Sequence, residues 1–217
     1  MATRRSWHLF GARNQARSGS SGSSGSSPAA VAVGELSPVE FIARLDQLVA
    51  VYAAAMRPAP ELLAGRRTIM AGHAGNPGFR ALAVTDDGTG ETVGFGYGFH
   101  GAAGQWWHDT VSRALAERRG DEAAAAWAGD SFEVAELHVA PDHQGHGIGA
   151  RLLRAAESTL AEQRGATSFR LHTGHRSEGN LRLYRKVGYQ TVGTSRGADG
   201  VEMIVLEKPA GQYAATA

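Results

Sequence analysis

The stretch that decides the fold runs from Pro141 to Glu157 and reads PDHQGHGIGARLLRAAE. Its second half predicts an amphipathic helix, because apolar residues recur at helical spacing: Ile148, Leu152, Leu153, Ala156 and Leu160. Its first half contains Gly145, Gly147 and Gly149. Glycine costs a helix about 0.5–1 kcal/mol relative to alanine. A helix that begins with three glycines therefore needs a compensating interaction at that end.

A bound anion is the interaction that this position favours. Residues 132–140 predict a strand, so the glycines lie where a strand passes into a helix. The first turn of a helix has unsatisfied N–H groups and a partial positive charge, which attract phosphate oxygens. Glycines let the backbone approach a pyrophosphate closely. The stretch therefore predicts a phosphate-binding loop.

Two common phosphate-binding patterns do not match this loop. A P-loop requires Gly-Lys-Ser or Gly-Lys-Thr, and here Ala150 and Arg151 follow Gly149. A Rossmann fold places its glycines after the first strand, with an acidic residue about 20 residues later. Here the glycines lie two thirds along the chain, and residues 165–173 contain no acid.

The motif Gln144-x-x-Gly147-x-Gly149 resembles the signature of the GNAT superfamily of N-acetyltransferases. It follows a predicted strand that ends in ELHVAPDH, as that family requires. Downstream, NLRLYRKVGY at 180–189 is similar to the second motif of the family. The resemblance covers residues 37–208, which is nearly the whole of the part that we expect to fold.

The resemblance implies an α/β fold with a mixed, mostly antiparallel sheet that splays in the middle and carries helices on both faces. It implies that acetyl-coenzyme A binds with its pyrophosphate on the backbone of Gln144, Gly145, His146, Gly147, Ile148, Gly149 and Ala150. It also implies that the pantetheine arm pairs with the end of the preceding strand, at Leu137, His138 and Val139.

The rest of the chain predicts elements that fit such a fold. Ser37, Pro38 and Glu40 form a capping-box start for a first helix, and residues 59–73 predict a second. Strands are expected at 80–84 and 92–99 around a turn at 86–90, followed by a helical insertion within 101–130. A strand at 167–173, a helix at 177–188 and two final strands at 189–194 and 201–209 complete the order.

The chain ends are expected to lie outside this domain. Residues 18–27 read SGSSGSSGSS, which has nothing to bury and is typical of a flexible linker. We therefore assign 1–34 to a basic tail and linker, 35–208 to the GNAT-like domain and 209–217 to a C-terminal tail.

Composition excludes several function classes. The 217 residues include no cysteine, which excludes disulfides and a cysteine nucleophile and fits a cytoplasmic protein. Residues 1–34 contain four arginines and no acid, so 18 basic and 21 acidic residues remain. That balance gives no reason to expect nucleic-acid binding. No apolar run is long enough to cross a membrane. The histidines have no defensible metal-ligand spacing, and we expect no metal.

Transfer of an acetyl group to an amine needs a base for the ammonium proton and an acid for the leaving thiolate. Tyr184 is the candidate acid, because in similar enzymes the matching tyrosine directs its hydroxyl at the sulfur; an ordinary packed aromatic is the alternative. The family often has Asn seven residues before this tyrosine, where this chain has Ser177. Asn180 is a candidate cofactor contact or a helix cap.

Glu133 and Glu136 on the predicted strand are the candidate bases. Strict alternation places them on opposite faces, with Glu133 on the side of Leu137 and Val139. A carboxylate inside a covered sheet is costly unless it is paired or functional. Glu136 is slightly favoured because it is closer to the expected thioester, and His138 is interpreted as a wall residue more readily than as a base.

The acceptor is expected to be the primary amine of a small molecule, attacked directly in a ternary complex. Trp106 and Trp107 in the insertion suggest a pocket wall, although anchoring the inserted helix to the core is at least as good an interpretation. A protein lysine or N-terminal acetyltransferase and a non-catalytic acyl-coenzyme A sensor are the alternatives. Such folds often form homodimers, but no feature of this sequence requires one.

Overall fold

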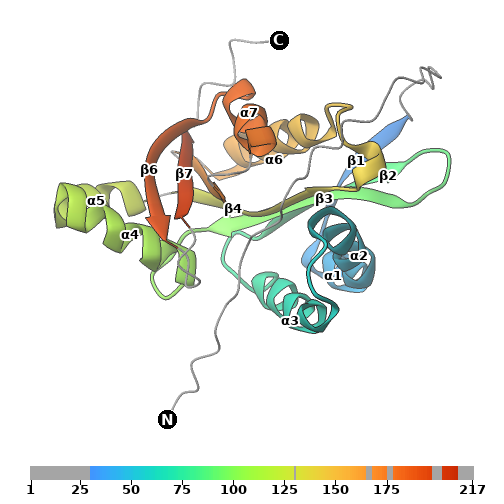
Figure 1. Cartoon of the computed structure of the whole chain (residues 1–217), viewed down its shortest axis with the longest axis horizontal. Helices are drawn as coiled ribbons and strands as arrows, with labels where there is room; N and C mark the ends of the chain where they lie inside the picture. The colour runs from blue at the N-terminus through green and yellow to red at the C-terminus, as the bar shows by residue number, and fades with distance from the viewer. Residues whose placement is uncertain (1–29, 130, 165–167, 175–177, 197–201, 210–217) are drawn as a thin grey trace. The chain divides into compact units, whose positions relative to one another are not determined.

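The computed structural model describes residues 30–129, 131–164, 168–174, 178–196 and 202–209. The chain divides into two compact units. Of the described residues, the first unit contains 30–99 and 134–159, and the second contains the rest. The elements of both are labelled in Figure 1, and each unit is described by itself.

The first unit has strands in the order β1-β2-β3-β4. They are β1 (Val31–Leu36), β2 (Arg80–Asp86), β3 (Thr92–His100) and β4 (Ser131–Val139), of which β4 begins in the second unit. β1 and β3 both pair with β2 in the antiparallel sense. The predicted hairpin of residues 80–99 is thereby confirmed.

β1 corrects the expected start of the domain. The boundary expected after residue 34 leaves residues 31–34 in the tail, but Val31 pairs with Asp86 and Gly34 with Ala83. Val31 and Val33 alternate with exposed neighbours and pack against the core of this unit. Two valines beside a Ser/Gly-rich run are too short a pattern to identify a strand, because an edge strand buries only one of its faces.

Three helices cover one face of this sheet (Figure 1). They are α1 (Pro38–Ala43), α2 (Leu45–Met56) and α3 (Leu63–His73), the last after a short 3-10 turn, η1 (Pro60–Leu62). The capping box predicted at Ser37 is present, with Pro38 in the first turn. The buried residues Phe41, Leu48 and Met70 pack with Phe95 and Tyr97 of β3.

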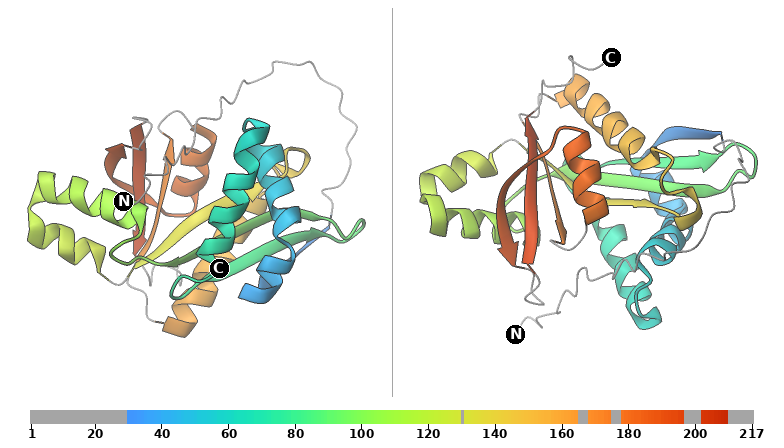
Figure 2. Two further views of the ribbon diagram at one scale, coloured as in Figure 1. Left: turned by 90° about the horizontal axis from the view of Figure 1, so that it is seen from below. Right: turned by 45° about the horizontal axis from the view of Figure 1, so that its top comes forward.

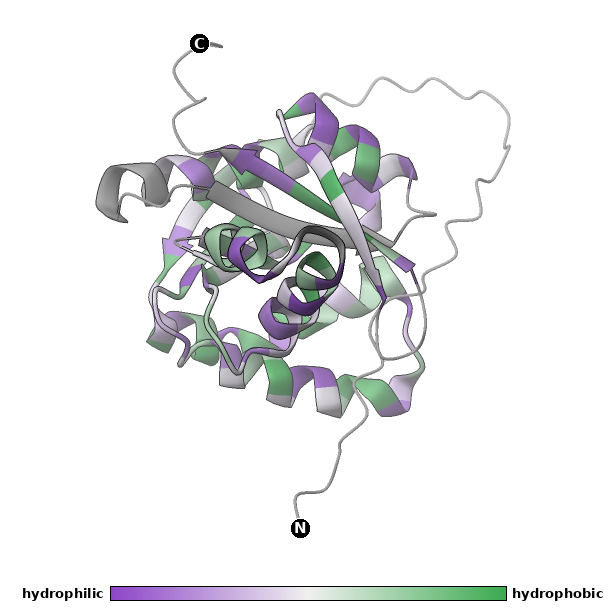
Figure 3. Ribbon diagram, turned by 90° about the vertical axis from the view of Figure 1, so that its left-hand side faces the viewer, coloured by the Kyte–Doolittle hydropathy of each residue, from purple (hydrophilic) through white to green (hydrophobic). Residues whose placement is uncertain are grey.

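The other face is covered by α6 (Ile148–Arg164), which follows the turn η2 (Pro141–His143) (Figure 2). Ile148 and Leu152 pack against Leu82, Val84 and Val93 of the sheet. Hydrophobic and hydrophilic segments alternate along the helices, as is typical of elements that bury one side (Figure 3). Helices on both faces are thus confirmed for this unit.

The second unit contains the start of β4 together with helices and strands from the insertion and from the last third of the chain. They are α4 (Trp106–Arg119), α5 (Asp121–Ala128), β5 (Ser168–Gly174), α7 (Glu178–Lys186), β6 (Gln190–Arg196) and β7 (Glu202–Pro209). The strand order is β4-β5-β7-β6. β5 runs parallel to β4, while β7 is antiparallel to both β5 and β6. The predicted mixed, mostly antiparallel α/β fold is confirmed.

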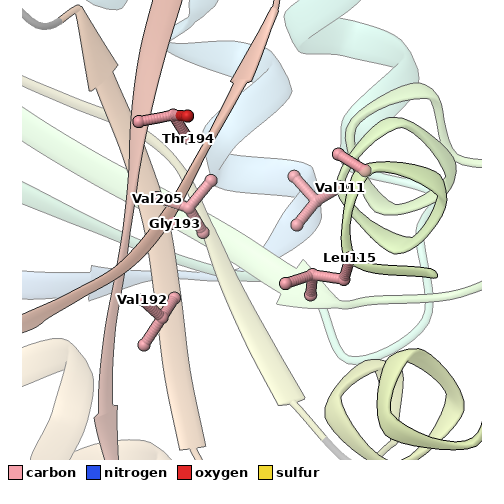
Figure 4. A pocket seen from close by; sticks show the side chains of 7 residues that line it. Val111, Leu115, Val192, Gly193, Thr194 and Val205 are labelled. Atoms are coloured by element: carbon pink, nitrogen blue, oxygen red, sulfur yellow. The ribbon is translucent and has the colours of Figure 1, made fainter. Parts of the chain in front are cut away.

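The inserted helix α4 packs against β6 and β7. Val111 and Leu115 of α4 form a cluster with Val205, and Trp107 packs on it. The packing leaves a cavity of about 50 Å³. Figure 4 shows the aliphatic side chains of α4 on one side of it and those of the two strands on the other. It is lined by Val111, Ala114, Leu115, Val192, Gly193, Thr194 and Val205.

Candidate functional site

The glycine loop differs from the helix start that the sequence suggests. α6 begins at Ile148, so Gly145 and Gly147 lie before the helix rather than in it. Their φ angles are +82° and +80°, a left-handed backbone that favours glycine. The helix-propensity penalty therefore applies to Gly149 alone. A Cβ at Gly145 or Gly147 would meet no protein atom within 4 Å, so this part of the loop is open.

The start of α6 presents unpaired amides. The first bond into the helix joins the amide of Arg151 to the carbonyl of Gly147. Among the described residues, the amides of Ile148, Gly149 and Ala150 have no hydrogen-bond acceptor. The side chains of Ile148 and Ala150 are buried in the core, so these two residues offer only their backbone. Free amides, an open loop and a helix N-terminus fit the pyrophosphate of a coenzyme.

Gln144 links this loop to the end of β4. Its side-chain amide donates to the carbonyl of Val139 over 2.9 Å. The amide of Ala140 donates to the carbonyl of Val93 on β3. Because backbone groups alternate along an antiparallel strand, those of His138 face β3, and those of Leu137 and Val139 face the opposite edge.

That opposite edge is the one on which the resemblance places the pantetheine arm. The pairs between β4 and β5 comprise only Ser131–Ser168, Phe132–Phe169 and Glu133–Arg170. Beyond Glu133, β4 has no further strand pair on this edge among the described residues. Leu137 thus offers its backbone groups to an extended ligand, and Val139 offers its amide, because its carbonyl accepts from Gln144. The backbone of His138 faces β3 instead.

Glu136 is the centre of a buried polar cluster in the first unit. Its Oε1 accepts a hydrogen bond of 2.7 Å from Nη1 of Arg66 on α3. Its Oε2 lies 2.5 Å from Nε2 of His138, two residues along the strand. Glu136, His138 and Arg66 are all less than a tenth exposed. The carboxylate that the sequence slightly favours is therefore buried and paired with both neighbours.

This environment keeps Glu136 ionised. Burial alone raises the pKa of a carboxyl group, but here the hydrogen bond from His138 and the electrostatic interactions with His138, Arg66 and His73 outweigh it, so the pKa of Glu136 lies below its usual value. An ionised carboxylate only accepts hydrogen bonds. The geometry therefore places a ring proton of His138 on Nε2, so Nδ1 is the ring nitrogen that is left for another partner.

Aromatic rings enclose this cluster. The ring of His138 lies edge-on to Tyr52, with centroids 5.2 Å apart, and is tilted against Phe95. Nδ1 of His138 has no hydrogen-bond partner among the described residues. An apolar enclosure with one free basic nitrogen is an arrangement that can take a proton from a bound ammonium group.

A second histidine lies beside the cluster. Nδ1 of His73 is 3.0 Å from the hydroxyl of Tyr97. Burial lowers the pKa of His73, and Arg66 adds to this effect while Glu136 opposes it. Burial and the charge of Glu136 raise the pKa of Tyr97 well above its usual value. Both groups are therefore uncharged at neutral pH.

Glu133, the other candidate base, is buried in the second unit. Its Oε1 lies 3.1 Å from Nδ1 of His108 on the inserted helix α4. Gly101 leaves the space that this pair occupies, because a Cβ there would clash with the carboxylate and lie 2.8 Å from Nδ1 of His108. The pair connects β4 to α4 and gives Glu133 a structural role beside any chemical one.

Tyr184 and Asn180 lie on α7 of the second unit. Tyr184 is buried and packs edge-on to Tyr189, with ring centroids 6.0 Å apart, while Asn180 is exposed. The predicted cap Ser177 lies outside the described residues. The acid role of Tyr184 and the cofactor contact of Asn180 stay predictions.

Trp107 of the insertion packs on the α4 cluster, which supports the anchoring interpretation for this residue. No group of three metal-ligating side chains occurs in the described parts of the chain, which exclude His175. None of the helices in these parts is long and apolar enough to span a membrane.

Arg66 was not identified from the sequence, and neither was the pairing of His108 with Glu133. Arg66 is one of two adjacent arginines on a predicted helix, and only the fold shows which of them turns inward. His108 lies in an insertion without a recognisable motif. For either residue, the sequence could indicate only that the position falls on the inward face of a helix.

Comparison with known sequences points to one family. The family model of the acetyltransferase (GNAT) domain matches residues 80–191, which is more than half of the chain. A GCN5-like protein acetyltransferase of Mycobacterium tuberculosis is 28% identical over 185 residues, covering 75% of this chain and 89% of its own length.

Solved structures share the fold. Aminoglycoside 6'-acetyltransferase type Ii superimposes with a TM-score of 0.58 at 21% identity, covering 82% of this chain and 97% of the other. The PaiA N-acetyltransferase of Thermoplasma acidophilum, solved in complex with coenzyme A, also has a TM-score of 0.58, at 17% identity, covering 83% and 99%. Both carry the fold predicted from the glycine motif.

Proposed function

This chain belongs to the GNAT family of acetyltransferases, which use acetyl-coenzyme A, and we propose that it acetylates the primary amine of a small molecule by direct attack. The observation that carries the proposal is the buried Glu136–His138 pair on the strand that leads into the glycine loop. Such a pair supplies the base that an ammonium substrate needs.

Backbone groups of this chain hold the coenzyme. The amides of Ile148, Gly149 and Ala150 bind the pyrophosphate, and the free edge of β4 binds the pantetheine arm. Acetyl-coenzyme A supplies the acetyl group as a thioester. These contacts orient the thioester without taking part in proton transfer.

Proton transfer falls to three side chains. A primary amine near pKa 10 is mostly protonated at neutral pH and cannot attack until it loses a proton. Nδ1 of His138 accepts that proton, and ionised Glu136 stabilises the imidazolium through Nε2. Tyr184 donates a proton to the departing sulfur. The enzyme carries no cysteine, so no cysteine-bound acetyl intermediate is available.

A protein acceptor is the second candidate. The relative from Mycobacterium tuberculosis is named a protein acetyltransferase, and it is more similar in sequence than the aminoglycoside enzyme. Trp107 packs on the α4 cluster, so it no longer supports the idea that the tryptophans of the insertion form the wall of a closed acceptor pocket. The small-molecule proposal rests on the enclosed setting of His138 and Glu136, which a bulky acceptor reaches less easily.

The cofactor site is tested by calorimetry with Gly147→Glu. Gly147 and Gly120 have φ angles of +80° and +86°, and a Cβ at either position would meet no protein atom within 4 Å. Gly120→Glu is therefore a matched control for backbone strain and added charge. We expect acetyl-coenzyme A to bind wild type and Gly120→Glu but not Gly147→Glu. Equal binding by all three would refute the site.

The acceptor is tested by thiol release with polyamines, aminoglycosides, an alanine-initiated peptide and a lysine peptide. We expect release with a small amine. Release with peptides alone would replace the proposal by the protein-modifying candidate. Binding of acetyl-coenzyme A without release on any acceptor would favour the sensor.

A further inference from the structure

We propose that Arg66 is a positioning residue for the acetyl transfer, which holds Glu136 in the orientation that directs its second oxygen at His138. The inference rests on the proposed function, because it concerns the same proton acceptor. Arg66 lies on α3, far from the glycine loop in sequence, and no motif identifies it.

The geometry of the carboxylate carries this proposal. Nη1 of Arg66 binds Oε1 of Glu136, and His138 binds Oε2, so each oxygen has a different partner. Rotation of the carboxylate would break both bonds together. Arg66 therefore fixes the position of Oε2, the oxygen that accepts from Nε2 of His138. Because Nε2 is held by this bond, Nδ1 is the ring nitrogen that is left for the substrate.

Arg66 is itself held in place. Its guanidinium carbon lies 4.7 Å from the centroid of the Tyr52 ring, a cation–π contact with a side chain of α2. The Arg66 side chain is 6% exposed, and that of Glu136 is 2% exposed. A planar guanidinium between an aromatic face and a carboxylate has little freedom to move.

Three side chains act on the ionisation of Glu136: Arg66 and His73 from α3 and His138 from β4. Two tyrosines belong to the same cluster, Tyr52 of α2 against Arg66 and Tyr97 of β3, whose own pKa the charge of Glu136 raises. Arg66 is the one permanent cation among them, because His73 is kept neutral by burial. Loss of Arg66 would leave a buried carboxylate with only neutral or titrating neighbours, and its pKa would rise.

The neighbouring Arg67 offers a matched control. It pairs with Asp46 over 2.7 Å through Nε, but the Arg67 and Asp46 side chains are 52% and 82% exposed. Arg67→Gln removes the same charge from the same helix without touching Glu136. Such exposed pairs contribute little to stability or to the ionisation of a buried group.

The test compares the pH dependence of kcat/KM in Arg66→Gln, Arg67→Gln and wild type. Glutamine keeps an amide donor near Glu136 but loses the charge. The acid limb reports protonation of the hydrogen-bonded Glu136–His138 pair. We expect it to move to higher pH by about one unit or more in Arg66→Gln, since the pair loses a neighbouring positive charge. Its KM for acetyl-coenzyme A should stay within about twofold, and Arg67→Gln should match wild type.

A structural role alone would give a different result. If Arg66→Gln lowers the melting temperature but leaves the acid limb unmoved, the proposal is wrong. Should that variant not fold, Arg66→Lys decides: the retained charge keeps the acid limb in place, while the altered geometry lowers kcat by about tenfold or more. An unchanged kcat in Arg66→Lys overturns the proposal.

Glu136→Gln separates this inference from the proposed function. If Glu136→Gln retains full kcat, the base assignment fails and Arg66 has nothing to position. If Glu136→Gln loses activity while the Arg66 variants keep the wild-type pH profile and kcat, the assignment of the Glu136–His138 pair as the base is retained. Only the positioning role of Arg66 is then overturned.

Discussion

Arg66 and Glu136 are separated by 70 residues in the chain, yet their side chains form a buried ion pair of 2.7 Å between α3 and β4. Removing two charges from water costs free energy that their attraction only partly returns. A pair of apolar residues would often stabilise a fold as well. The pair is therefore better explained by the chemistry of the site than by stability.

The pair makes stability depend on pH. The pKa of Glu136 is lowered in the folded protein from its usual value of 4.5. A group of this kind stabilises the fold above its unfolded pKa, and the stabilisation is lost as pH falls through the folded pKa. We expect the difference in melting temperature between wild type and Glu136→Gln to be largest above about pH 5 and to shrink below about pH 4.

Thermal unfolding at several pH values measures this difference. Glu35→Gln serves as the control, because Glu35 is exposed on β1 and pairs with the partly exposed Arg80. A difference that stays constant from about pH 3 to about pH 7 would contradict the lowered pKa of Glu136.

The sequence pointed to the loop, to Glu136 and to the neighbouring His138, but not to the groups that reach Glu136 from other elements. Glycine spacing is local information, and so is the alternation that places Glu136 within β4. Arg66 comes from a helix whose inward face is decided by packing against β3 and β4. Nothing in the local pattern distinguishes it from Arg67, because both positions suit a helix equally.

The order of the elements was predicted from the first helix onward, but β1 and several details were not. The helix expected after Ser37 is interrupted at Arg44, between α1 and α2. All three glycines of the predicted loop were expected at the start of the helix, whereas positive φ angles place Gly145 and Gly147 before it. A sequence shows where glycine occurs but not whether the backbone there is helical or left-handed.

Tyr184→Phe tests the general acid. If the hydroxyl protonates the leaving thiolate, kcat should fall by about a hundredfold or more, while the affinity for acetyl-coenzyme A stays nearly unchanged. Tyr189→Phe is the matched control, because it removes a hydroxyl from the ring that packs against Tyr184. Steady-state kinetics and calorimetry give the two quantities. Equal kcat in both variants would remove Tyr184 from the mechanism.

Gly101→Ala should destabilise the second unit. The new methyl group would clash with the Glu133 carboxylate and approach Nδ1 of His108, both of which are buried. Overpacking of this kind costs about 1–3 kcal/mol. Gly65→Ala, at an open position of α3, should instead stabilise by about 0.5–1 kcal/mol. Urea unfolding compares the two, and a stabilised Gly101→Ala would show that the pair moves freely.

Gly193→Ala should stabilise the protein by filling the cavity beside α4. Gly193 lines that cavity, and a Cβ there would meet no atom within 4 Å. Replacing glycine by alanine at a compatible backbone position stabilises by about 0.4–1 kcal/mol through the unfolded chain alone. The added methyl group contacts no side chain closely, but it takes up space in a cavity that is lined mostly by apolar side chains, so it should also bury some apolar surface.

Gly34→Ala separates these two effects. Gly34 is an exposed strand residue on β1 with equally open surroundings, but it lines no part of this cavity. Gly34→Ala should show the unfolded-state gain without burying apolar surface in the cavity, so urea unfolding should give the larger increase for Gly193→Ala. An equal increase would mean that the methyl group does not fill the cavity, and a decrease would mean that β6 requires a glycine at its irregular pairing with β7.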